Sequence, residues 1–402
     1  MRVVVFLNQT GSMTSCFFPI CHRRKSPPPG HHQVDIEEEI SSIQNIKLYT
    51  YKELRFATEN FSPSNKIGVG GFGTVYKGSL SDGTLAAIKV LSVDSRQGVK
   101  EFLTEIVVIS GLEHENLVKL HGCCVEGDHR ILVYGYLENN SIAQTLIGSR
   151  SSGIQFTWSG RRNICIGVAR GLAFLHEEIQ PQIIHRDIKA SNILLDKDLT
   201  PKISDFGLAK LFPDNLTHIS TRIAGTPGYL APEYVIRGQL TKKADIYSFG
   251  VLLLEIVSGR SNTNKRLPLA DQYLLERAWK FYQKGELAEL VDFSLGANFD
   301  IDEAFRYIKI ALLCTNFMPN SRPSMPTVVK MLTGEMNVDG MEISEPSLLP
   351  EGMGLRNRMK KSMHTLSAAP GNENNKPLSL QSPAVSTTQA TMTFTSISDR
   401  ST

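Results

Sequence analysis

The chain contains the stretches His185-Arg186-Asp187-Ile188-Lys189-Ala190-Ser191-Asn192, Asp205-Phe206-Gly207 and Ala231-Pro232-Glu233, in that order. They match the patterns H-R-D-x-x-x-x-N, D-F-G and A-P-E. The first two offer carboxylate and amide oxygens, which are the ligands that Mg²⁺ prefers in proteins. Three ordered patterns of this kind do not arise by chance, so this region is expected to carry the chemistry of the protein.

A glycine-rich stretch lies upstream of these motifs. Gly68-Val69-Gly70-Gly71-Phe72-Gly73 fits G-x-G-x-x-G, which by itself also describes a plain β-turn or the start of a dinucleotide-binding fold. In a dinucleotide fold a helix follows the glycines, whereas here Thr74-Val75-Tyr76-Lys77 predicts a strand and Ser81-Asp82-Gly83 predicts a hairpin turn. Because glycines carry no side chain, the backbone N–H groups of such a hairpin can lie over phosphates.

Lys89 and Glu105 form a candidate ion pair. Lys89 stands in the apolar strand pattern Leu85–Val90, where an unpaired charge would be costly to bury. Glu105 lies near the apolar face of a predicted helix over Val99–Ser110. Pairing explains both residues, although a lone lysine is more often found at a solvated strand edge.

The periodicity changes along residues 49–337. Strand patterns dominate the first part, whereas Ile164, Val168, Leu172 and Leu175 form a helical stripe after Trp158. The sequence therefore predicts a small strand-rich lobe, followed by a larger helical lobe. A cleft between two such lobes is the expected place for a ligand.

These motifs together resemble a eukaryotic protein kinase domain over residues 61–337. The stretches that resemble the plant receptor-like kinase and Pelle group are Thr50-Tyr51-Lys52-Glu53-Leu54, Ala57-Thr58-Glu59-Asn60-Phe61, Gly122-Cys123-Cys124 and Lys243-Ala244-Asp245-Ile246-Tyr247-Ser248-Phe249-Gly250. Because no membrane span is read from the sequence, the chain is similar to receptor-like cytoplasmic kinases. The resemblance implies an α+β fold with a β-rich N-lobe at about 61–134 and a helical C-lobe at about 138–337.

The resemblance also implies an activity, in which the γ-phosphate of ATP moves to Ser or Thr hydroxyls of protein substrates with Mg²⁺ as cofactor. Asp187 would accept or orient the hydroxyl proton, and Lys189 would steady the γ-phosphate. Lys89, held by Glu105, would bind the α- and β-phosphates, and Asn192 and Asp205 would bind Mg²⁺. The nucleotide-binding candidates are Ile67, Gly68, Gly70, Gly73, Val75, Ala87, Lys89, Tyr134, Tyr136, Leu137 and Leu194.

Within that nucleotide site, Val75 and Ala87 would cover the adenine from above and Leu194 from below. The resemblance places Tyr134 at the gatekeeper position, with Gly135-Tyr136-Leu137 as the hinge. Related sequences often have an acid where Gly135 stands, so we expect altered hinge flexibility rather than loss of binding.

Residues near the catalytic motifs indicate which hydroxyl groups accept the phosphate and how the activity is regulated. Lys189 and the stretch Gly225-Thr226-Pro227-Gly228-Tyr229 resemble Ser/Thr kinases rather than tyrosine kinases. Arg186 is placed to bind a phosphate on the activation segment. The candidate regulatory residues of that segment are Thr217, Ser220, Thr221 and Thr226, of which Thr226 is expected to face the catalytic loop.

Three structural expectations accompany these roles. Glu233 and Arg322 are predicted to form a buried ion pair, as in the family. Asp245 is predicted to brace the backbone of the catalytic loop from a buried helix. Cys123 and Cys124 are predicted to be packed at the end of a strand.

Composition narrows the function classes. The chain has 402 residues with 43 basic and 40 acidic side chains, and this net charge of +3 argues against a nucleic-acid-binding protein. Its 6 cysteines are scattered, which is unlike a disulfide scaffold. Two alternatives stay open: a pseudokinase scaffold, disfavoured by the intact catalytic residues, and a small-molecule kinase. The latter is disfavoured by the long activation segment, which serves peptide docking.

The ends of the chain are predicted to be irregular. Residues 1–48 read as a flexible arm, and residues 338–402 read as a disordered tail rich in Ser and Thr. Acylation of Cys16 and Cys21, next to the basic run His22-Arg23-Arg24-Lys25, would supply the two signals needed for stable membrane anchoring. The alternative is an arm with incidental cysteines. We therefore expect a cytoplasmic protein that works at the inner face of the plasma membrane with an upstream receptor kinase.

Overall fold

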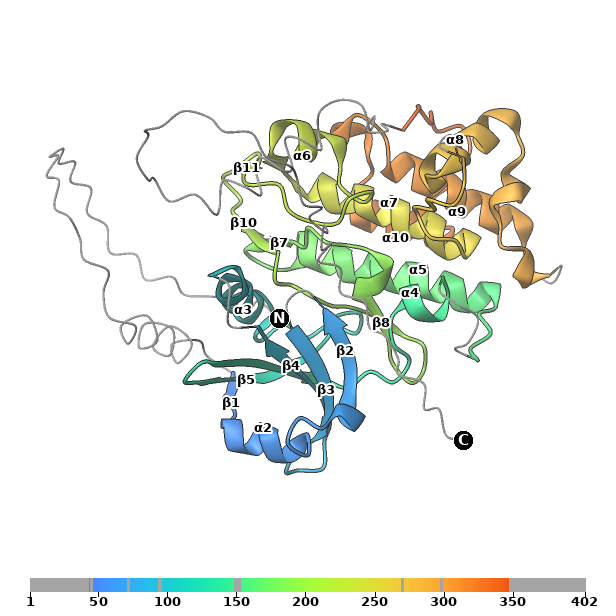
Figure 1. Cartoon of the computed structure of the whole chain (residues 1–402). Coiled ribbons are helices and arrows are strands. Elements are labelled where there is room, and N and C mark those ends of the chain that lie inside the picture. Colours follow the sequence, from blue (N-terminus) through green and yellow to red (C-terminus); the bar gives the residue numbers. More distant parts are fainter. Residues whose placement is uncertain are drawn as a thin grey trace, which may run out of the picture.

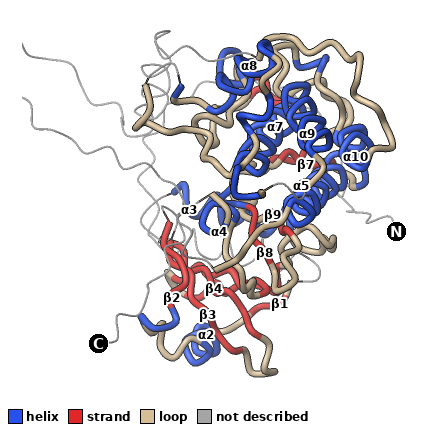
Figure 2. Tube along the Cα trace, turned by 90° about the vertical axis from the view of Figure 1, so that its right-hand side faces the viewer, coloured by secondary structure: helices blue, strands red, loops and turns tan. Residues whose placement is uncertain are grey.

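The computed structural model describes residues 43, 46–70, 73–92, 96–147, 153–268, 271–296 and 299–346. These residues form two lobes, one made of strands and one made mostly of helices (Figure 1). A view turned by 90° shows the same division, with the sheet at one end of the molecule and most helices at the other (Figure 2). The predicted two-lobed α+β fold is confirmed. The expectations for residues 1–42 and 347–402 lie outside the described residues.

The N-lobe is built on a six-stranded sheet with the strand order β1-β5-β6-β4-β3-β2. Its strands are β1 (Lys47–Leu48), β2 (Lys66–Gly70), β3 (Gly73–Ser79), β4 (Leu85–Leu91), β5 (Leu120–Glu126) and β6 (His129–Gly135). The predicted hairpin is present, since β3 pairs antiparallel with β4 from Gly73↔Leu91 to Ser79↔Leu85. Helix α3 (Arg96–Ile109) packs on this sheet through the fully buried side chains of Phe102 and Ile106.

The sheet begins earlier than predicted, because the supposed flexible arm of residues 1–48 includes strand β1. This strand runs parallel to β5, with Lys47 opposite Gly122 and Leu48 opposite Cys123. The close approach requires a glycine, since a Cβ on Gly122 would lie 2.0 Å from the carbonyl oxygen of Lys47. Backbone pairing, which composition does not reveal, therefore orders the end of the arm.

Helix α2 (Tyr51–Ala57) follows β1 and packs at the end of the molecule away from the helical lobe (Figure 1). Thr50 and Glu53 form a capping box at its start, in which each side chain accepts a hydrogen bond from the other residue's backbone N–H. Leu54 is fully buried against the sheet, in a cluster that includes Ile88 and Val133. The N-lobe thus contains a strand and a helix that precede residue 61.

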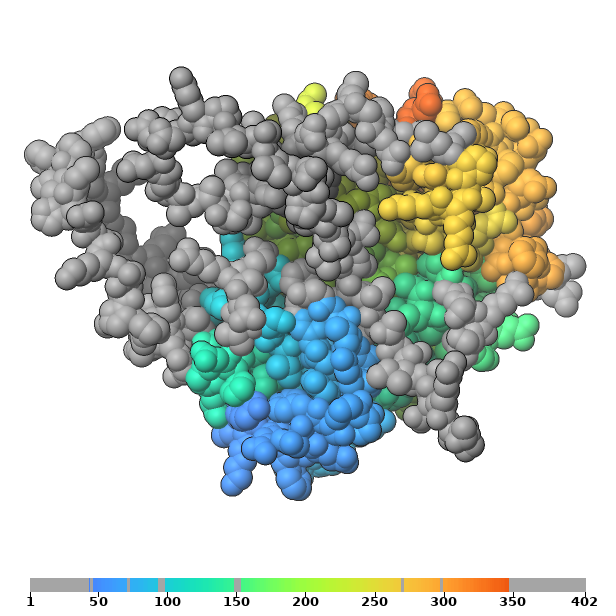
Figure 3. All heavy atoms as spheres, viewed as in Figure 1, coloured from blue at the N-terminus to red at the C-terminus, as the bar shows by residue number. Residues whose placement is uncertain are grey.

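The C-lobe surrounds helix α7 (Lys242–Ser258), which is buried on nearly all sides. Its other helices are α4 (Ile142–Thr145), α5 (Trp158–Ala173), α6 (Pro232–Arg237), α8 (Leu274–Lys284), α9 (Ile301–Cys314) and α10 (Met325–Thr333). Its short strands are β7 (Gln182–Ile184), β8 (Ile193–Leu195), β9 (Pro201–Ile203), β10 (Lys210–Phe212), β11 (Ile219–Ser220) and β12 (Gln239–Leu240). In the space-filling view the two lobes occupy opposite ends of the same face (Figure 3). Among the described residues, no helix has the length and apolar character needed to cross a bilayer.

The boundary predicted at residue 338 also needs correction. Val338 is buried, the Asn316 side-chain amide donates to Ser344 Oγ at 2.8 Å, and Asn316 forms a β-bridge with Pro346. Residues 338–346 are therefore part of the C-lobe surface rather than of the predicted tail.

Leu54→Ala tests whether the segment before residue 61 stabilises the domain. We expect the free energy of unfolding of the full chain to fall by about 2–5 kcal/mol, because a fully buried leucine leaves a cavity. Urea denaturation followed by fluorescence measures this. Phe56→Ala, at an 87% exposed position on the same helix, is the matched control and should change stability by less than about 0.5 kcal/mol. Equal effects of the two variants would contradict the packing described for α2.

Candidate active site

A buried carboxylate fixes the loop that carries His185–Asn192, as the sequence predicted. Asp245 on α7 accepts hydrogen bonds from the backbone N–H groups of His185 at 2.7 Å and Arg186 at 2.8 Å. The ring Nε2 of His176 lies 3.0 Å from the same carboxylate. Burial alone would raise the pKa of Asp245, but the His176 contact and the backbone donors outweigh it and lower the pKa. An ionised carboxylate thus holds the loop, in which Arg186 has a positive φ of 72°.

Asp187 lies at the centre of a small polar cluster. Lys189 Nζ is 2.8 Å from Asp187 Oδ2, and the Asn192 amide donates to the same oxygen at 3.0 Å. The Thr226 hydroxyl donates to Asp187 Oδ1 at 2.6 Å and accepts from Lys189 Nζ at 2.8 Å. The structure therefore brings three predicted residues together, with Thr226 facing the catalytic loop as expected. It also shows that a hydroxyl fits between Asp187 and Lys189.

Lys89 links the two lobes through a pair of carboxylates. Its Nζ lies 3.1 Å from Glu105 Oε2 on α3 and 3.2 Å from Asp205 Oδ1 in the C-lobe. Burial favours the neutral amine, but Asp205 and Glu105 outweigh it and raise the pKa of Lys89. Burial likewise favours the neutral form of Asp205, but Lys89 and Lys189 outweigh it and hold its pKa below the usual range. The predicted Lys89–Glu105 pair is present, and Asp205 makes it a triad.

Phe206, which follows Asp205, is held beside α3 by several contacts. Phe206 is fully buried, its N–H donates to Glu105 Oε1 at 3.4 Å, and its ring meets the His185 ring edge to face with centroids 4.7 Å apart. Asp205 itself has a positive φ of 69°. These contacts keep the Asp205 carboxylate turned toward Lys89.

The predicted nucleotide-binding residues line the sheet and the connection between the lobes. Ile67, Gly68 and Gly70 lie in β2, Gly73 and Val75 in β3, Ala87 and Lys89 in β4, Tyr134 in β6, Tyr136 and Leu137 after β6, and Leu194 in β8. Register places Val75 opposite Lys89, and Ala87 opposite Tyr134. Gly73 has a φ of 148°, and a Cβ there would lie 2.0 Å from the Val90 carbonyl oxygen, so only glycine fits this end of the hairpin.

The segment after β6 connects the lobes. Tyr136 N–H donates to the Leu85 carbonyl at 3.3 Å, and Leu195 N–H donates to the Asn140 carbonyl at 2.8 Å. Residues 135–140 are therefore tied to both β4 and β8, as expected for a hinge. A Cβ on Gly135 would meet only His121 Nε2, at 3.4 Å, so a larger residue fits there. The nearby Tyr134 side chain has its pKa raised by burial and by the Glu105 carboxylate.

Residues 61–332 match the family described as the protein kinase domain. The chain belongs to the protein kinase family. It is similar to "Cold-responsive protein kinase 1" of Arabidopsis thaliana, with 65% identity over 345 residues that cover 85% of this chain and 87% of the relative.

Other relatives from the same plant are larger. Two probable LRR receptor-like serine/threonine-protein kinases are 52% and 56% identical, over 84% and 77% of this chain. The matches cover only 34% and 30% of those relatives. The kinase is therefore of the plant receptor-like kinase and Pelle type, as the sequence motifs indicated.

The activation segment of this kinase is attached to the catalytic loop through Arg186. Its guanidinium donates to the carbonyls of Leu208 and Arg222, each at 2.9 Å, and to the Tyr234 hydroxyl at 2.6 Å. Tyr234 in turn donates to the Arg222 carbonyl at 2.9 Å and accepts from the Ala224 N–H at 3.0 Å. Sequence reasoning did not identify Tyr234, because nothing in its neighbourhood signals a contact with the catalytic loop.

One further expectation for the kinase is confirmed, and a second is confirmed in part. The guanidinium of Arg322, with a fully buried side chain, makes two 2.8 Å contacts with the Glu233 carboxylate. Arg322 also donates to the Lys243 carbonyl at 2.9 Å, which ties α6 to the start of α7. Cys123 and Cys124 are buried as predicted, but they lie in the middle of β5 rather than at its end, because the strand continues to Glu126.

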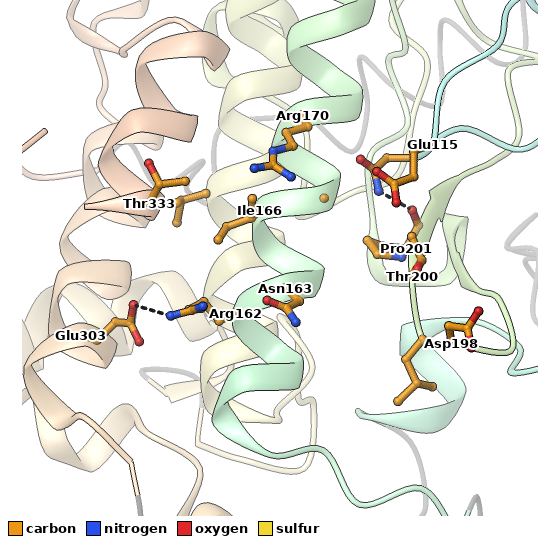
Figure 4. Close-up of a pocket in the computed structure, with 14 residues that line it drawn as sticks. Glu115, Arg162, Asn163, Ile166, Arg170, Asp198, Thr200, Pro201, Glu303 and Thr333 are labelled. Carbon is orange, nitrogen blue, oxygen red and sulfur yellow. Dashed lines mark hydrogen bonds and ion pairs between the residues drawn. The ribbon is translucent and has the colours of Figure 1, made fainter. Parts of the chain in front are cut away.

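A surface pocket of about 450 Å³ is drawn in Figure 4, and its lining includes none of Lys89, Asp187 or Asp205. It is lined by α5, the turn before β9, and the ends of α9 and α10. Its charges are mixed, since Arg162 and Arg170 face the acids Glu115, Asp198 and Glu303, and Arg162 lies 3.8 Å from Glu303. This balance of charges favours no particular ligand.

Glu255 on α7 is a buried residue whose role the sequence analysis did not predict. Its carboxylate accepts hydrogen bonds from the Tyr229 hydroxyl at 2.7 and 2.8 Å and from the Asn262 N–H at 2.7 Å. The Ser248 hydroxyl donates to the Tyr229 carbonyl at 2.7 Å. Residues 226–230, which we name the docking loop, are thereby fastened to α7. Burial raises the pKa of Glu255 to about 7 despite these donors.

Glu255→Gln tests this environment. The folded protein binds a proton on Glu255 more tightly than the unfolded chain does, and this binding stabilises the fold. The stabilisation is complete below about pH 4.5 and is lost as the pH rises to about 7. Glutamine retains an oxygen acceptor but does not titrate. We expect the difference in unfolding free energy, wild type minus variant, to fall by about 1.4 kcal/mol per pH unit between these values. Urea unfolding at several pH values measures it, and a flat difference would contradict the raised pKa.

Proposed function

We propose that this kinase transfers the γ-phosphate of ATP to serine or threonine hydroxyl groups of proteins in receptor-linked signalling. The observation that carries the proposal is the hydroxyl of Thr226, held 2.6 Å from Asp187 and 2.8 Å from Lys189. A substrate hydroxyl has the same chemistry. The names of the two receptor-like relatives, which are given as probable serine/threonine-protein kinases, support the same conclusion.

Phosphoryl transfer depends mostly on positioning the reacting groups and on stabilising their negative charge, and the candidate side chains supply both. Lys89 is kept cationic by its two carboxylates and would bind the α- and β-phosphates. Asp187 would accept or orient the proton of the attacking hydroxyl, while Lys189 would steady the charge on the γ-phosphate. All of these groups are already held by neighbours, so they need little rearrangement when substrate binds.

Asp205 and Asn192 fit a Mg²⁺ site. Asp205 is held ionised, and Asn192 uses its amide nitrogen on the carbonyl and carboxylate of Asp187, which leaves its side-chain oxygen available. These are hard oxygen donors of the kind Mg²⁺ takes alongside nucleotide phosphates. When bound, Mg²⁺ supplies charge neutralisation for the phosphates.

The test is phosphate transfer by the full chain from radiolabelled ATP to a mixed protein substrate. Asp187→Asn should reduce the rate by about 10²–10⁴-fold, because asparagine cannot accept the hydroxyl proton. Acid hydrolysis of the labelled product should give phosphoserine and phosphothreonine. Equal labelling by wild type and variant would instead favour a scaffold without catalysis, and label in small molecules alone would favour a metabolic kinase.

We further propose that phosphorylation of the activation segment raises activity, with Thr221 as the main site among Thr217, Ser220 and Thr221. Thr221 N–H donates to the Gly238 carbonyl at 3.2 Å, and the next residue's carbonyl is held by Arg186. Cations gather here, since burial and the charges of Lys100 and Arg186 lower the pKa of Lys210. A phosphate would relieve this repulsion and order the segment.

Thr221→Ala should therefore lower kcat/KM for a protein substrate, and phosphatase treatment of the wild type should do the same. Steady-state kinetics of both preparations, with phosphosite mapping by mass spectrometry, makes the comparison. If neither treatment changes the kinetics, Thr221 is not the regulatory site.

Membrane association through acylated Cys16 and Cys21 is also proposed, although both cysteines lie outside the described residues. An acyl chain together with the basic run at residues 22–25 provides two anchoring signals. Cell fractionation of a variant with both cysteines changed to serine tests the idea, since unchanged partitioning would contradict it.

A further inference from the structure

Three arginines converge on a second pocket beside the docking loop. The pocket has a volume of about 370 Å³ and lies between the end of α4, the loop after α7 and the start of α8. Arg260, Arg266 and Arg277 line it, together with polar side chains and one acid, Asp271. Such a concentration of guanidinium groups in a concave site is unlike the mixed charges of the pocket in Figure 4.

Acids offset the positive charge of this pocket only in part: Asp292 and Glu289 act on Arg260, and Asp271 lines the pocket. Asp271 pairs instead with Lys280, at 3.5 Å, and no ion pair joins the three arginines to a described carboxylate. Arg260 and Arg277 are half-buried, and burial, followed by the charge of Arg277, lowers the pKa of Arg260. Two cations held close together in a partly desolvated site favour an anion between or beside them.

The pocket is rigidly connected to the docking loop. Asn262 donates from its side chain to the Gly228 carbonyl at 2.9 Å and from its backbone to Glu255 at 2.7 Å. Its own carbonyl accepts from Leu274 N–H at 2.9 Å, at the start of α8. Thr263 lines the pocket, and its hydroxyl lies 3.5 Å from the position that a Cβ on Gly228 would take. The wall of the pocket is therefore also the support of the docking loop.

We propose that the arginine pocket binds an acidic or phosphorylated side chain of the peptide substrate, on a residue that flanks the phosphoacceptor. The proposal rests on the proposed function. It takes residues 226–230 as the surface that receives the peptide, because Thr226 lies against Asp187 and Lys189. Guanidinium groups match carboxylate and phosphate oxygens with two parallel hydrogen bonds, which suits selection of one anionic side chain. The position beside the docking loop favours an anion on that peptide over a separate ligand.

Peptide kinetics with the full-length kinase test the proposal. A set of serine peptides carries Ala, Lys, Glu or phosphoserine at each position flanking the acceptor. We expect the wild type to prefer an anion at one or more positions, by roughly tenfold or more in kcat/KM, as for loss of a charge-assisted hydrogen bond. The comparison of glutamate with phosphoserine peptides shows which anion the pocket selects.

Arg260→Gln and Arg277→Gln should raise KM for the preferred anionic peptide about tenfold, with kcat and the KM for ATP unchanged, because only peptide binding is weakened. The neutral peptide should be unaffected, and Arg277→Lys should restore part of the preference. Lys284→Gln, at an exposed cation near the other end of α8, is the matched control and should behave as the wild type. Thermal unfolding of each variant verifies that the fold is retained.

Two outcomes overturn the proposal in distinguishable ways. Phosphorylation of peptides without preference for an anion, or with a preference that the arginine variants leave unchanged, overturns the pocket and leaves the kinase activity standing. Failure of the wild type to phosphorylate any peptide or protein overturns the proposed function and the pocket with it.

Discussion

The carboxylates buried along helix α7 are the constraint on which the rest of the site depends. Asp245 near one end holds the backbone of His185 and Arg186, and Glu255 near the other end holds Tyr229 and Asn262. A buried carboxyl group is costly unless its oxygens are hydrogen-bonded, so each of the two strongly favours the one loop conformation that satisfies it. The helix thereby positions the catalytic loop and the docking loop relative to each other.

Lys89 connects the two lobes through ion pairs. Its strand belongs to the N-lobe, while its carboxylate partners come from α3 and from the C-lobe. Asp205 and Glu105 raise the pKa of Lys89, and Lys89 and Lys189 in turn lower the pKa of Asp205. The relative position of the lobes therefore affects the electrostatics of the site. Movement of α3 away from the sheet would leave Glu105 without Lys89 and would leave Lys89 paired with Asp205 alone.

The docking loop, residues 226–230, lies next to these charged groups. The docking loop is fastened to the C-lobe by Ser248, Glu255 and Asn262, which come from α7 and the loop that follows it. That same loop forms a wall of the arginine pocket. One short segment thus holds the docking loop through Asn262 and lines, through Ser261 and Thr263, the pocket that we propose for an anionic side chain.

The sequence by itself determined the catalytic chemistry and the two-lobed fold, because the catalytic residues sit in short motifs whose spacing is local. The ion pair between Lys89 and Glu105 could also be predicted from the sequence, because either charge would be costly to bury alone. Only the tertiary structure decided which distant groups share one environment. The pairing of β1 with Gly122, the packing of residues 338–346 and the contact of Tyr234 with Arg186 all join segments that are separated in the chain. Such contacts depend on backbone pairing and burial in three dimensions, which a single sequence does not display as a pattern.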